Sequence, residues 1–320
     1  MKDKYNLKGL LSNTSIDHSD INKPDVARLF IHHHEVIGSH LLPGLEIDTE
    51  EKDENIIIHM KLKKNTVIDK PVQMCFGMIP ENGVQHIVIN ALIEENAKIE
   101  VLAHCVFPNA KKVIHKMDAQ IHLKKNASYN YFEKHVHGES GGTEVIPKAQ
   151  IKLGENARFK TEFELLEGRV GKIDIDYDVD CEKHSVLEMM ARINGKENDI
   201  IKIRESANLI GESARGLLTS RIAARGRTNA EVISKLTASA PHARGHVDCK
   251  EIVKDEAVVS AVPIVEVNNP KAHITHEASL GSVDSKQLQT LMAHGLPEEE
   301  AVFNMKKTQI NWLRIDFCRY

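Results

Sequence analysis

Five cysteines are the side chains of this 320-residue protein best suited to chemistry. Their number is odd and their spacing irregular, so they do not form the framework of a disulfide-rich protein. A lone cysteine is more often a small packed side chain than a reactive one, and we expect that role for Cys75, Cys181 and Cys318. Cys249 differs because it lies in the polar sequence His-Val-Asp-Cys-Lys, which favours a functional thiol.

Histidines form three further candidate motifs. Residues 32–35 read His-His-His-Glu, a run that either binds a metal or forms a solvated helix face. His276-Glu277 begins like the zinc motif of metalloproteases, but position 280 is Leu, so that motif is incomplete. His135 and His137 share one face of a strand, and they either line an interior path or face solvent.

The elements that position these residues are marked by a recurring polar turn, which ends in Asn-Ala or a similar pair at intervals of roughly 30 residues. The clear copies end at Ala97, Ala127 and Ala157, and the weaker ones are His184-Ser185, Ser213-Ala214, Asn229-Ala230 and Glu256-Ala257. Asn tolerates the left-handed backbone of a tight corner, and alternating apolar residues after each turn indicate strands. The pattern predicts a mainly β protein built as a parallel β-helix.

Both ends of the chain have helical rather than strand spacing. Residues 21–40 predict a helix with Pro24 near its start. Residues 285–294 predict an amphipathic helix stopped by Gly295, and a second helix follows from residue 296. We therefore expect an N-terminal helical segment (1–45), a parallel β-helix core (46–278) and a C-terminal helical module (279–320).

Composition and missing motifs exclude several functions. The net charge of −4 argues against a dedicated nucleic-acid binder. The apolar runs are too short to span a membrane, and the N-terminus lacks the apolar stretch of a signal peptide. We therefore expect a cytoplasmic protein with reduced thiols. The sequence contains neither a phosphate-binding glycine loop nor a nucleophile elbow.

Three blocks stand in a fixed order near the C-terminal end. They read P-x-V-E-V-x-N-P-x-A (Pro263 to Ala272), H-E-A-S (His276 to Ser279) and Q-L-x(6)-G-L-x-E-E-x-A (Gln287 to Ala301). The blocks strongly resemble the SufB/SufD family of iron–sulfur cluster assembly scaffolds, and a weaker similarity covers residues 85–157. Together they span roughly residues 75–305 and imply a right-handed parallel β-helix with a helical C-terminal module.

The resemblance assigns roles to individual residues. Cys249 matches a cysteine implicated in cluster assembly in the B-type members, although its strand continues Lys-Glu-Ile-Val-Lys-Asp and departs from their pattern. Glu277 matches a glutamate implicated with it, and His276 matches a functional histidine of the D-type members. Cys105 matches a cysteine that accepts sulfur. Because both cysteines and the glutamate are present, the chain is more similar to SufB than to SufD.

The same resemblance implies a mechanism. Sulfur from a cysteine desulfurase or other donor is received at Cys105 and passes to Cys249, where iron joins it with Glu277 and His276 in a transient iron–sulfur cluster. The positions of the channel Gln and Trp in B-type members read His135 and His137 here, so the resemblance does not fix the details of sulfur transfer. The chain is then a scaffold and not an enzyme.

The resemblance also implies partners. A SufC-like ABC ATPase, docking at about residues 280–312, hydrolyses ATP, and the chain pairs as a homodimer or with a SufD-like paralogue.

The donor set agrees with this interpretation, since one thiolate with a carboxylate and an imidazole holds iron less firmly than four thiolates. His276 and Glu277 are adjacent, however, and face opposite sides of a regular strand. Both serve one site only if the backbone bends or two subunits contribute. Two alternatives remain: a SufD-like structural partner without cluster chemistry, and a carbohydrate-active β-helix enzyme with carboxylates in a groove.

Overall fold

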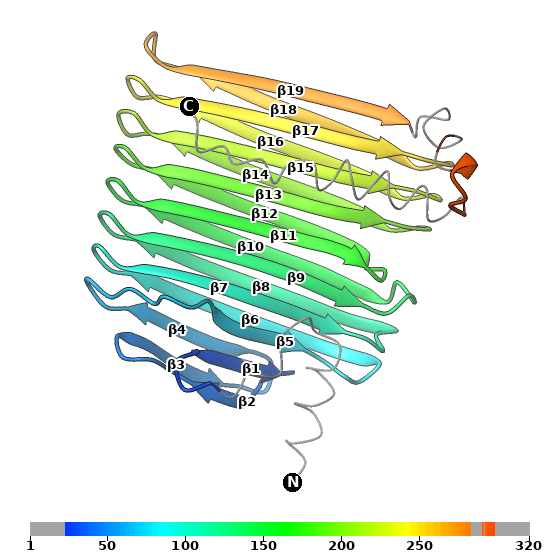
Figure 1. The fold of residues 1–320 in the computed structure, drawn as a ribbon, viewed down its shortest axis with the longest axis horizontal. Helices are drawn as coiled ribbons and strands as arrows, with labels where there is room; N and C mark the ends of the chain where they lie inside the picture. The colour runs from blue at the N-terminus through cyan, green and yellow to red at the C-terminus, as the bar shows by residue number, and fades with distance from the viewer. Residues whose placement is uncertain (1–22, 283–289, 291, 298–320) are drawn as a thin grey trace.

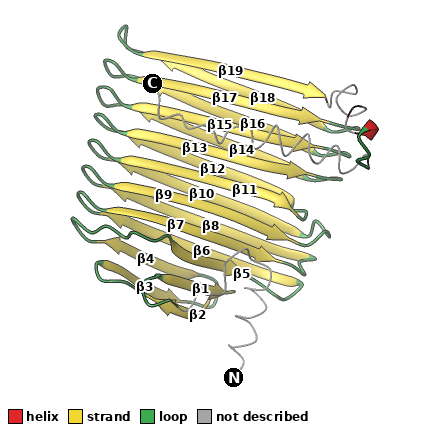
Figure 2. Cartoon of the chain, in the orientation of Figure 1, coloured by secondary structure: helices red, strands yellow, loops and turns green. Residues whose placement is uncertain are grey.

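The computed structural model describes residues 23–282, 290 and 292–297. Its nineteen strands wind into stacked coils, and successive strands alternate between two facing sheets over most of the stack (Figure 1). Strands dominate the described part of the chain (Figure 2). The predicted parallel β-helix is confirmed as a parallel β-solenoid, while its right-handed winding stays a prediction.

One sheet has ten strands in the order β19-β17-β15-β13-β11-β9-β7-β5-β1-β2. Its strands are β1 (Arg28–His32), β2 (Glu35–His40), β5 (Val72–Gly77), β7 (Lys98–Phe107), β9 (Ser128–His137), β11 (Arg158–Glu167), β13 (Val186–Gly195), β15 (Arg215–Ala224), β17 (Arg244–Val253) and β19 (His273–Ser282). All its pairs are parallel except β1–β2.

The facing sheet has nine strands in the order β18-β16-β14-β12-β10-β8-β6-β4-β3. Its strands are β3 (Leu45–Glu51), β4 (Ile56–Leu62), β6 (Asn82–Ile93), β8 (Lys112–Leu123), β10 (Thr143–Leu153), β12 (Gly171–Cys181), β14 (Ile200–Leu209), β16 (Asn229–Ala238) and β18 (Val258–Val267). Here β3–β4 is the antiparallel pair.

The helix expected over residues 21–40 is wrong for the residues described, because β1 and β2 form a hairpin that joins the sheet beside β5. Leu29, Phe30 and Ile31 are all buried, so the run lacks the alternation that identifies a strand. The strand is buried on both faces: Phe30 packs with Cys75 under the hairpin, and its neighbours join the main core.

The expected C-terminal helices lie mostly outside the described residues. Residues 290, 292 and 293 are helical, which leaves the predicted module a prediction, and β19 continues to Ser282, past the expected domain boundary at 278.

The Asn corners form as the sequence predicts. Asn96, Asn126 and Asn156 have φ of 58°, 57° and 57°, and a small buried Ala follows each of them. Their side chains stack in a ladder, in which Asn126 Nδ2 donates to Asn96 Oδ1 at 2.8 Å and Asn96 Nδ2 donates to Asn65 Oδ1 at 2.8 Å. Each corner therefore supports the next one along the stack.

Two of the weaker turn predictions belong to a different edge. After Ser213 (φ 59°), the same set of corners continues at His242 (φ 61°), which precedes Ala243. Asn229 instead begins β16, and Glu256-Ala257 precedes β18 at the opposite edge. The interval between Ala214 and Ala230 is much shorter than the others because these two turns lie at opposite edges of the coils.

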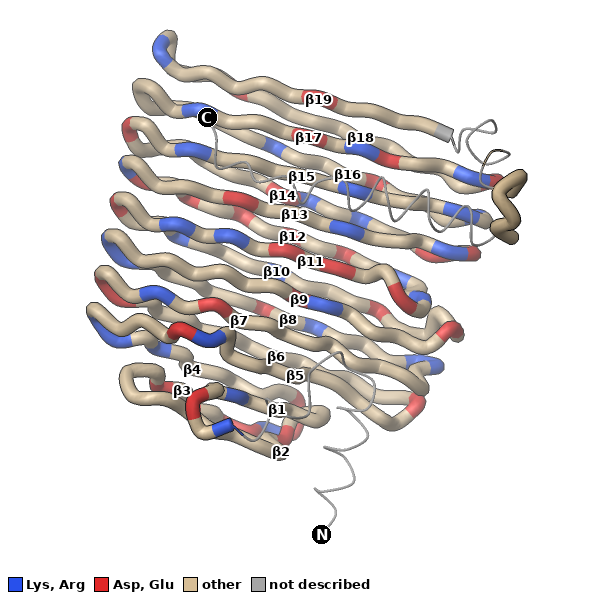
Figure 3. The backbone as a smooth tube through the Cα atoms, in the orientation of Figure 1, with Lys and Arg blue, Asp and Glu red and all other residues tan. Residues whose placement is uncertain are grey.

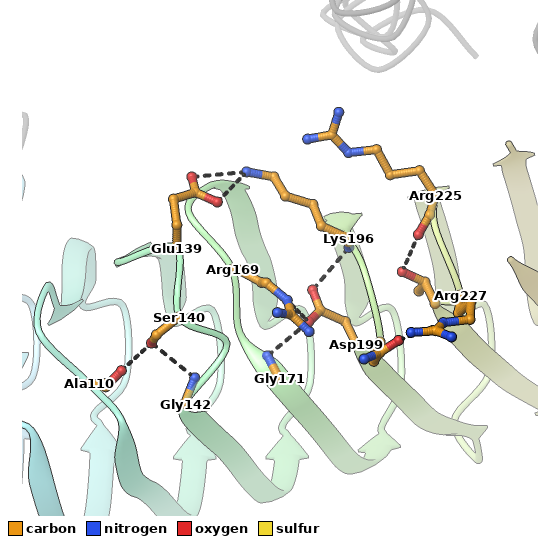
Figure 4. A network of polar contacts seen from close by, with 12 residues as sticks. Ala110, Glu139, Ser140, Gly142, Arg169, Gly171, Lys196, Asp199, Arg225 and Arg227 are labelled. Carbon is orange, nitrogen blue, oxygen red and sulfur yellow. Dashed lines mark hydrogen bonds and ion pairs between the residues drawn. The ribbon is translucent and has the colours of Figure 1, made fainter. Parts of the chain in front are cut away.

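The opposite edge is held by buried polar contacts (Figure 4). Asp199 has no solvent exposure and accepts hydrogen bonds from Arg169 Nε at 2.8 Å, Lys196 N at 3.0 Å and Gly171 N at 3.2 Å. The Asp199 carboxylate thus links two successive corners. It also accepts hydrogen bonds from two backbone N–H groups, those of Gly171 and Lys196, that lie at the corners.

Alternate residues of each strand point into the lumen between the sheets, where the main core lies. Basic and acidic residues are interspersed along the coils (Figure 3). Among the described residues, no helix is long and apolar enough to cross a membrane.

Candidate functional site

The first group of lumenal polar side chains surrounds Cys105, which is fully buried on β7. The Cys105 thiol donates to Glu133 Oε1 at 3.4 Å, and His135 Nε2 lies 2.7 Å from the same oxygen. His135 Nδ1 lies 3.1 Å from His137 Nε2, while His115 approaches from β8 on the facing sheet. We call these five residues the Cys105 cluster.

Burial sets the protonation of the Cys105 cluster. It raises the pKa of Cys105 well above its ordinary value, with Glu133 adding to the effect. It lowers the pKa of His115 to about 3 and that of His137 well below the ordinary value. Burial would raise the pKa of Glu133, but His135 outweighs it and the pKa of this carboxyl is lowered. The cluster therefore holds a carboxylate beside a neutral thiol.

A second group surrounds Cys249, which is fully buried on β17 in register with Ser220 of β15. Ser220 Oγ donates to Glu251 Oε1 at 2.7 Å. From the facing sheet come Glu205 and Ser234, which are paired in register and buried. We call these five residues the Cys249 cluster.

The carboxyls of the Cys249 cluster are protonated more readily than ordinary ones. Burial raises the pKa of Glu205 to about 8 and that of Glu251 to about 7. Burial also raises the pKa of the Cys249 thiol. This region of the lumen is therefore close to neutral in charge near pH 7.

One lumenal column connects the two clusters. The register places Glu133, Phe163, Ala191, Ser220 and Cys249 on successive strands of the ten-stranded sheet. Four strand steps of about 4.8 Å separate Glu133 from Cys249, which is roughly 19 Å. The column is filled by side chains rather than open, and Phe163 and Ala191 form its apolar middle.

The facing side of this middle section is more polar. Tyr177 is buried on β12 of the facing sheet and Tyr131 is partly buried on β9, and desolvation, followed by the charge of Glu133, raises the pKa of both phenols well above the ordinary value. A cavity of about 30 Å³ is lined by both tyrosines and by Thr161. It has room for about one water molecule, and most of its other lining side chains are apolar, among them Met117, Ile121 and Ile151.

The structure separates the three residues expected around the assembly thiol. His276 is in register with buried Val247, on the lumenal side, and Ala278 is in register with Cys249. Glu277 is in register with Asp248 and its Oε1 lies 3.7 Å from Lys250 Nζ, on the outer side. The expected opposition of His276 and Glu277 is confirmed, so one copy brings Cys249 and His276 to a common face but not Glu277.

The other sequence candidates do not converge on a site. Cys75 and Cys181 are fully buried, and burial raises the pKa of each to about 12, while Cys318 lies outside the described residues. In the histidine run, His32 Nε2 accepts from Ile79 N at 3.3 Å and His34 Nε2 accepts from His86 N at 3.1 Å. These rings are occupied by separate backbone contacts.

Sequence reasoning missed His115, Glu133, Glu205 and Glu251. Strand alternation gave a signal for two of them, because Glu133 shares a face with His135 and Glu251 shares one with Cys249. His115 and Glu205 come from the facing sheet, and only the register between coils shows which residues they meet.

The sequence that forms this lumen, with its two buried thiols, is similar to known proteins. The family model described as SUF system FeS cluster assembly, SufBD core domain, matches residues 79–305. The chain belongs to the SufBD family. The resemblance noted in the sequence is therefore confirmed.

Named SufBD relatives match most of the chain. An iron–sulfur cluster assembly SufBD family protein of Methanocaldococcus jannaschii is 38% identical over 81% of this chain and 82% of its own length. One from Pyrococcus horikoshii is 33% identical over 86% and 84%. One from Staphylococcus epidermidis is 24% identical over 74% of this chain and 51% of its own length.

Proposed function

We propose that this SufBD family chain is the scaffold subunit of a SUF-type complex that builds a transient iron–sulfur cluster as its product. The observation that carries the proposal is that Cys105 and Cys249 face one lumen, in two clusters of buried polar side chains joined by one column of the ten-stranded sheet. Sulfur enters at Cys105 and is used at Cys249. A SufD-like structural role is the alternative.

The Cys105 cluster is suited to accept sulfur from a persulfide donor such as a cysteine desulfurase. As the Cys105 sulfur attacks the terminal sulfur of the persulfide, its proton passes by way of Glu133, whose Oε1 is 3.4 Å away, to the departing donor thiolate. The donor thiolate leaves and Cys105 carries the persulfide. A dithiol reductant then supplies two electrons, becomes a disulfide and releases hydrosulfide, a species small enough for the lumen.

The Cys249 cluster receives this sulfur one strand below the end of the stack. Thiolate with carboxylate or imidazole ligands can hold iron without the permanence of four thiolates. We propose Cys249, His276 and Glu277 as the ligands of the growing cluster. Because Glu277 faces outward in one copy, this set needs a second subunit or a local bend of β19.

The end of the stack offers a surface for that second subunit. Among the described strands, β18 and β19 each have a neighbour on one side only, and their apolar side chains Val258, Val267 and Leu280 are 61%, 49% and 56% exposed. Unpaired strand edges with exposed apolar residues favour association. We propose a homodimer here, with a SufD-like paralogue as the other possible partner.

Energy for the assembly is proposed to come from a SufC-like ABC ATPase that binds at about residues 280–312, so that the scaffold is not itself an enzyme. The four described cysteines are free thiols, which is consistent with the cytoplasmic location we propose.

Anaerobic co-purification with the ATPase tests the proposal through iron, sulfide and visible absorption. The wild type should yield a brown complex, Cys249→Ser should lose the colour with unchanged subunit stoichiometry, and Cys181→Ser should keep it. Equal iron and sulfide in wild type and Cys249→Ser would contradict the assignment. A colourless wild-type complex that resists reconstitution would favour the SufD-like structural role.

A further inference from the structure

Three side chains of the Cys105 cluster converge in a way that acceptance of sulfur does not require. One possible ligand atom from each of Cys105, His115 and Glu133 lies within 4.8 Å of the other two. They come from three strands, β7, β8 and β9, and span both sheets, so the fold itself brings them together. Their exposed fractions are 0%, 1% and 1%.

His115 points to a missing partner. Neither of its ring nitrogens has a hydrogen-bond partner, although the ring is buried against Phe107 and His135. A buried polar atom normally finds a partner, and an unpaired one opposes folding. A neutral imidazole has a free lone pair. Beside a thiol and a carboxylate, it can therefore serve as a metal ligand.

We infer that Cys105, His115 and Glu133 bind a divalent first-row transition-metal ion of the Zn²⁺ or Fe²⁺ class. Sulfur, nitrogen and oxygen donors in one set suit these ions, whereas Mg²⁺ and Ca²⁺ prefer oxygen alone. The inference rests on these side chains and does not depend on the assembly function proposed above.

The distances agree with a tetrahedral ion. With metal–sulfur and metal–oxygen bonds of about 2.3 and 2.1 Å, two ligands at a tetrahedral angle lie ~3.6 Å apart. Cys105 Sγ and Glu133 Oε1 are 3.4 Å apart. The ion replaces the thiol proton, and its two positive charges balance the thiolate and carboxylate, which removes the cost of burying either anion alone.

His135 is a positioning residue for this site. Its Nε2 is 2.7 Å from Glu133 Oε1, closer than two ligands of one tetrahedral ion should lie, so it orients the carboxylate by a hydrogen bond. His137 in turn contacts His135 at 3.1 Å. Three protein ligands are also the number found in sites that exchange a fourth, small ligand.

Cobalt binding tests the site in the full-length protein. The reduced, metal-stripped chain is unfolded and refolded anaerobically with Co²⁺, so that burial does not limit access. The wild type should show a near-ultraviolet thiolate-to-cobalt band and the visible bands of tetrahedral Co²⁺, and Zn²⁺ should abolish both. Circular dichroism confirms that each variant has refolded.

The variants separate ligands from neighbours. Cys105→Ser should lose the thiolate band, and His115→Gln should weaken Co²⁺ binding by more than the roughly 10- to 100-fold expected for the positioning variant His135→Gln. Cys181→Ser, which changes an equally buried lumenal thiol, should bind like the wild type. Cys249→Ser should also keep the band, so this site and the assembly proposal fail separately.

Three results would overturn the inference. The first is a refolded wild type without a thiolate-to-cobalt band. The second is a band that persists in Cys105→Ser, and the third is an equal affinity of wild type and His115→Gln for Co²⁺, since either would place the ion elsewhere.

Discussion

The Cys105 and Cys249 clusters occupy the same kind of lumen but treat a buried thiol differently. Around Cys105 a carboxylate stays charged because His135 contacts it, whereas around Cys249 two carboxyls have raised pKa values because burial is poorly compensated. The first cluster lies well inside the stack, while the second lies one strand from its end.

This difference shows how a uniform coil can support two chemical roles. Fixed donors deep in the stack suit capture of a ligand or a sulfur atom, since they need no rearrangement. Neutral carboxyls near the end of the stack can ionise when a cation binds. This favours a site that forms only as the cluster is built. The Asn ladder of Asn65, Asn96 and Asn126 lies at the other edge of the coils from the Cys105 cluster, since Asn96 precedes the start of β7 and Cys105 lies near its end.

The largest expected effect comes from blocking the column between the clusters. Ala191 is 1% exposed and is the smallest side chain of the column, between Phe163 and Ser220 in register, so Ala191→Leu adds bulk midway between the clusters. We expect cluster formation to fall near the Cys249→Ser level while sulfur still loads onto Cys105, measured by mass spectrometry of the trapped persulfide. The added bulk should cost about 1–3 kcal/mol of stability.

Ala207→Leu is the matched control for this variant. Ala207 is equally buried but lies in another column of the facing sheet, between Val179 and Leu236. It should cost similar stability and leave cluster formation near the wild-type level. If Ala191→Leu assembles clusters as well as Ala207→Leu, sulfur does not travel along this column.

The two clusters should respond to pH with opposite signs. The pKa of Glu205 is raised to about 8 in the folded chain against an ordinary 4.5, so its favourable contribution is present below pH ~4.5 and is lost as pH rises through 8. Glu205→Gln removes this loss. From about pH 5 to about pH 9, the variant should therefore gain roughly 2–4 kcal/mol of unfolding free energy relative to wild type, measured by chemical denaturation.

Glu133→Gln should do the reverse. The pKa of Glu133 is lowered from 4.5, so the carboxylate stabilises the fold above that pH and this contribution is lost on acidification. The variant should be less stable than wild type at neutral pH, and the difference should shrink as pH falls below about 4.5. Both titrations are run without metal. Parallel pH profiles for the two variants would refute the electrostatic contrast.

The coil architecture was accessible from sequence because one local feature repeats. Asn96, Asn126 and Asn156 mark corners whose backbone few residues tolerate, and the strands between them alternate regularly. The N-terminal hairpin was missed because β1 is buried on both faces, so its run of apolar residues lost the period of two that identifies a strand.

The site was only partly accessible. Cys105, Cys249 and His276 were named from family motifs, and the structure places them on lumenal faces. The partners of each thiol depend on which residues two sheets bring opposite one another, and a local pattern carries no such information. His115 is the clearest case, since an isolated histidine on a strand gave no reason to pair it with a cysteine ten residues before it.

The smallest expected effect concerns the Asn corner ladder, at the other edge of the coils from the Cys105 cluster. Asn126 has φ of 57°, and its side-chain amide donates to Asn96. Asn126→Ala should cost about 1–2 kcal/mol, because a left-handed backbone is unfavourable for Ala. Asn126→Gly removes that strain and should cost less, while Asn130→Ala in β9 serves as a control without a left-handed backbone. If Asn126→Gly is as damaging as Asn126→Ala in denaturant, the side-chain ladder rather than the backbone stabilises this end of the stack.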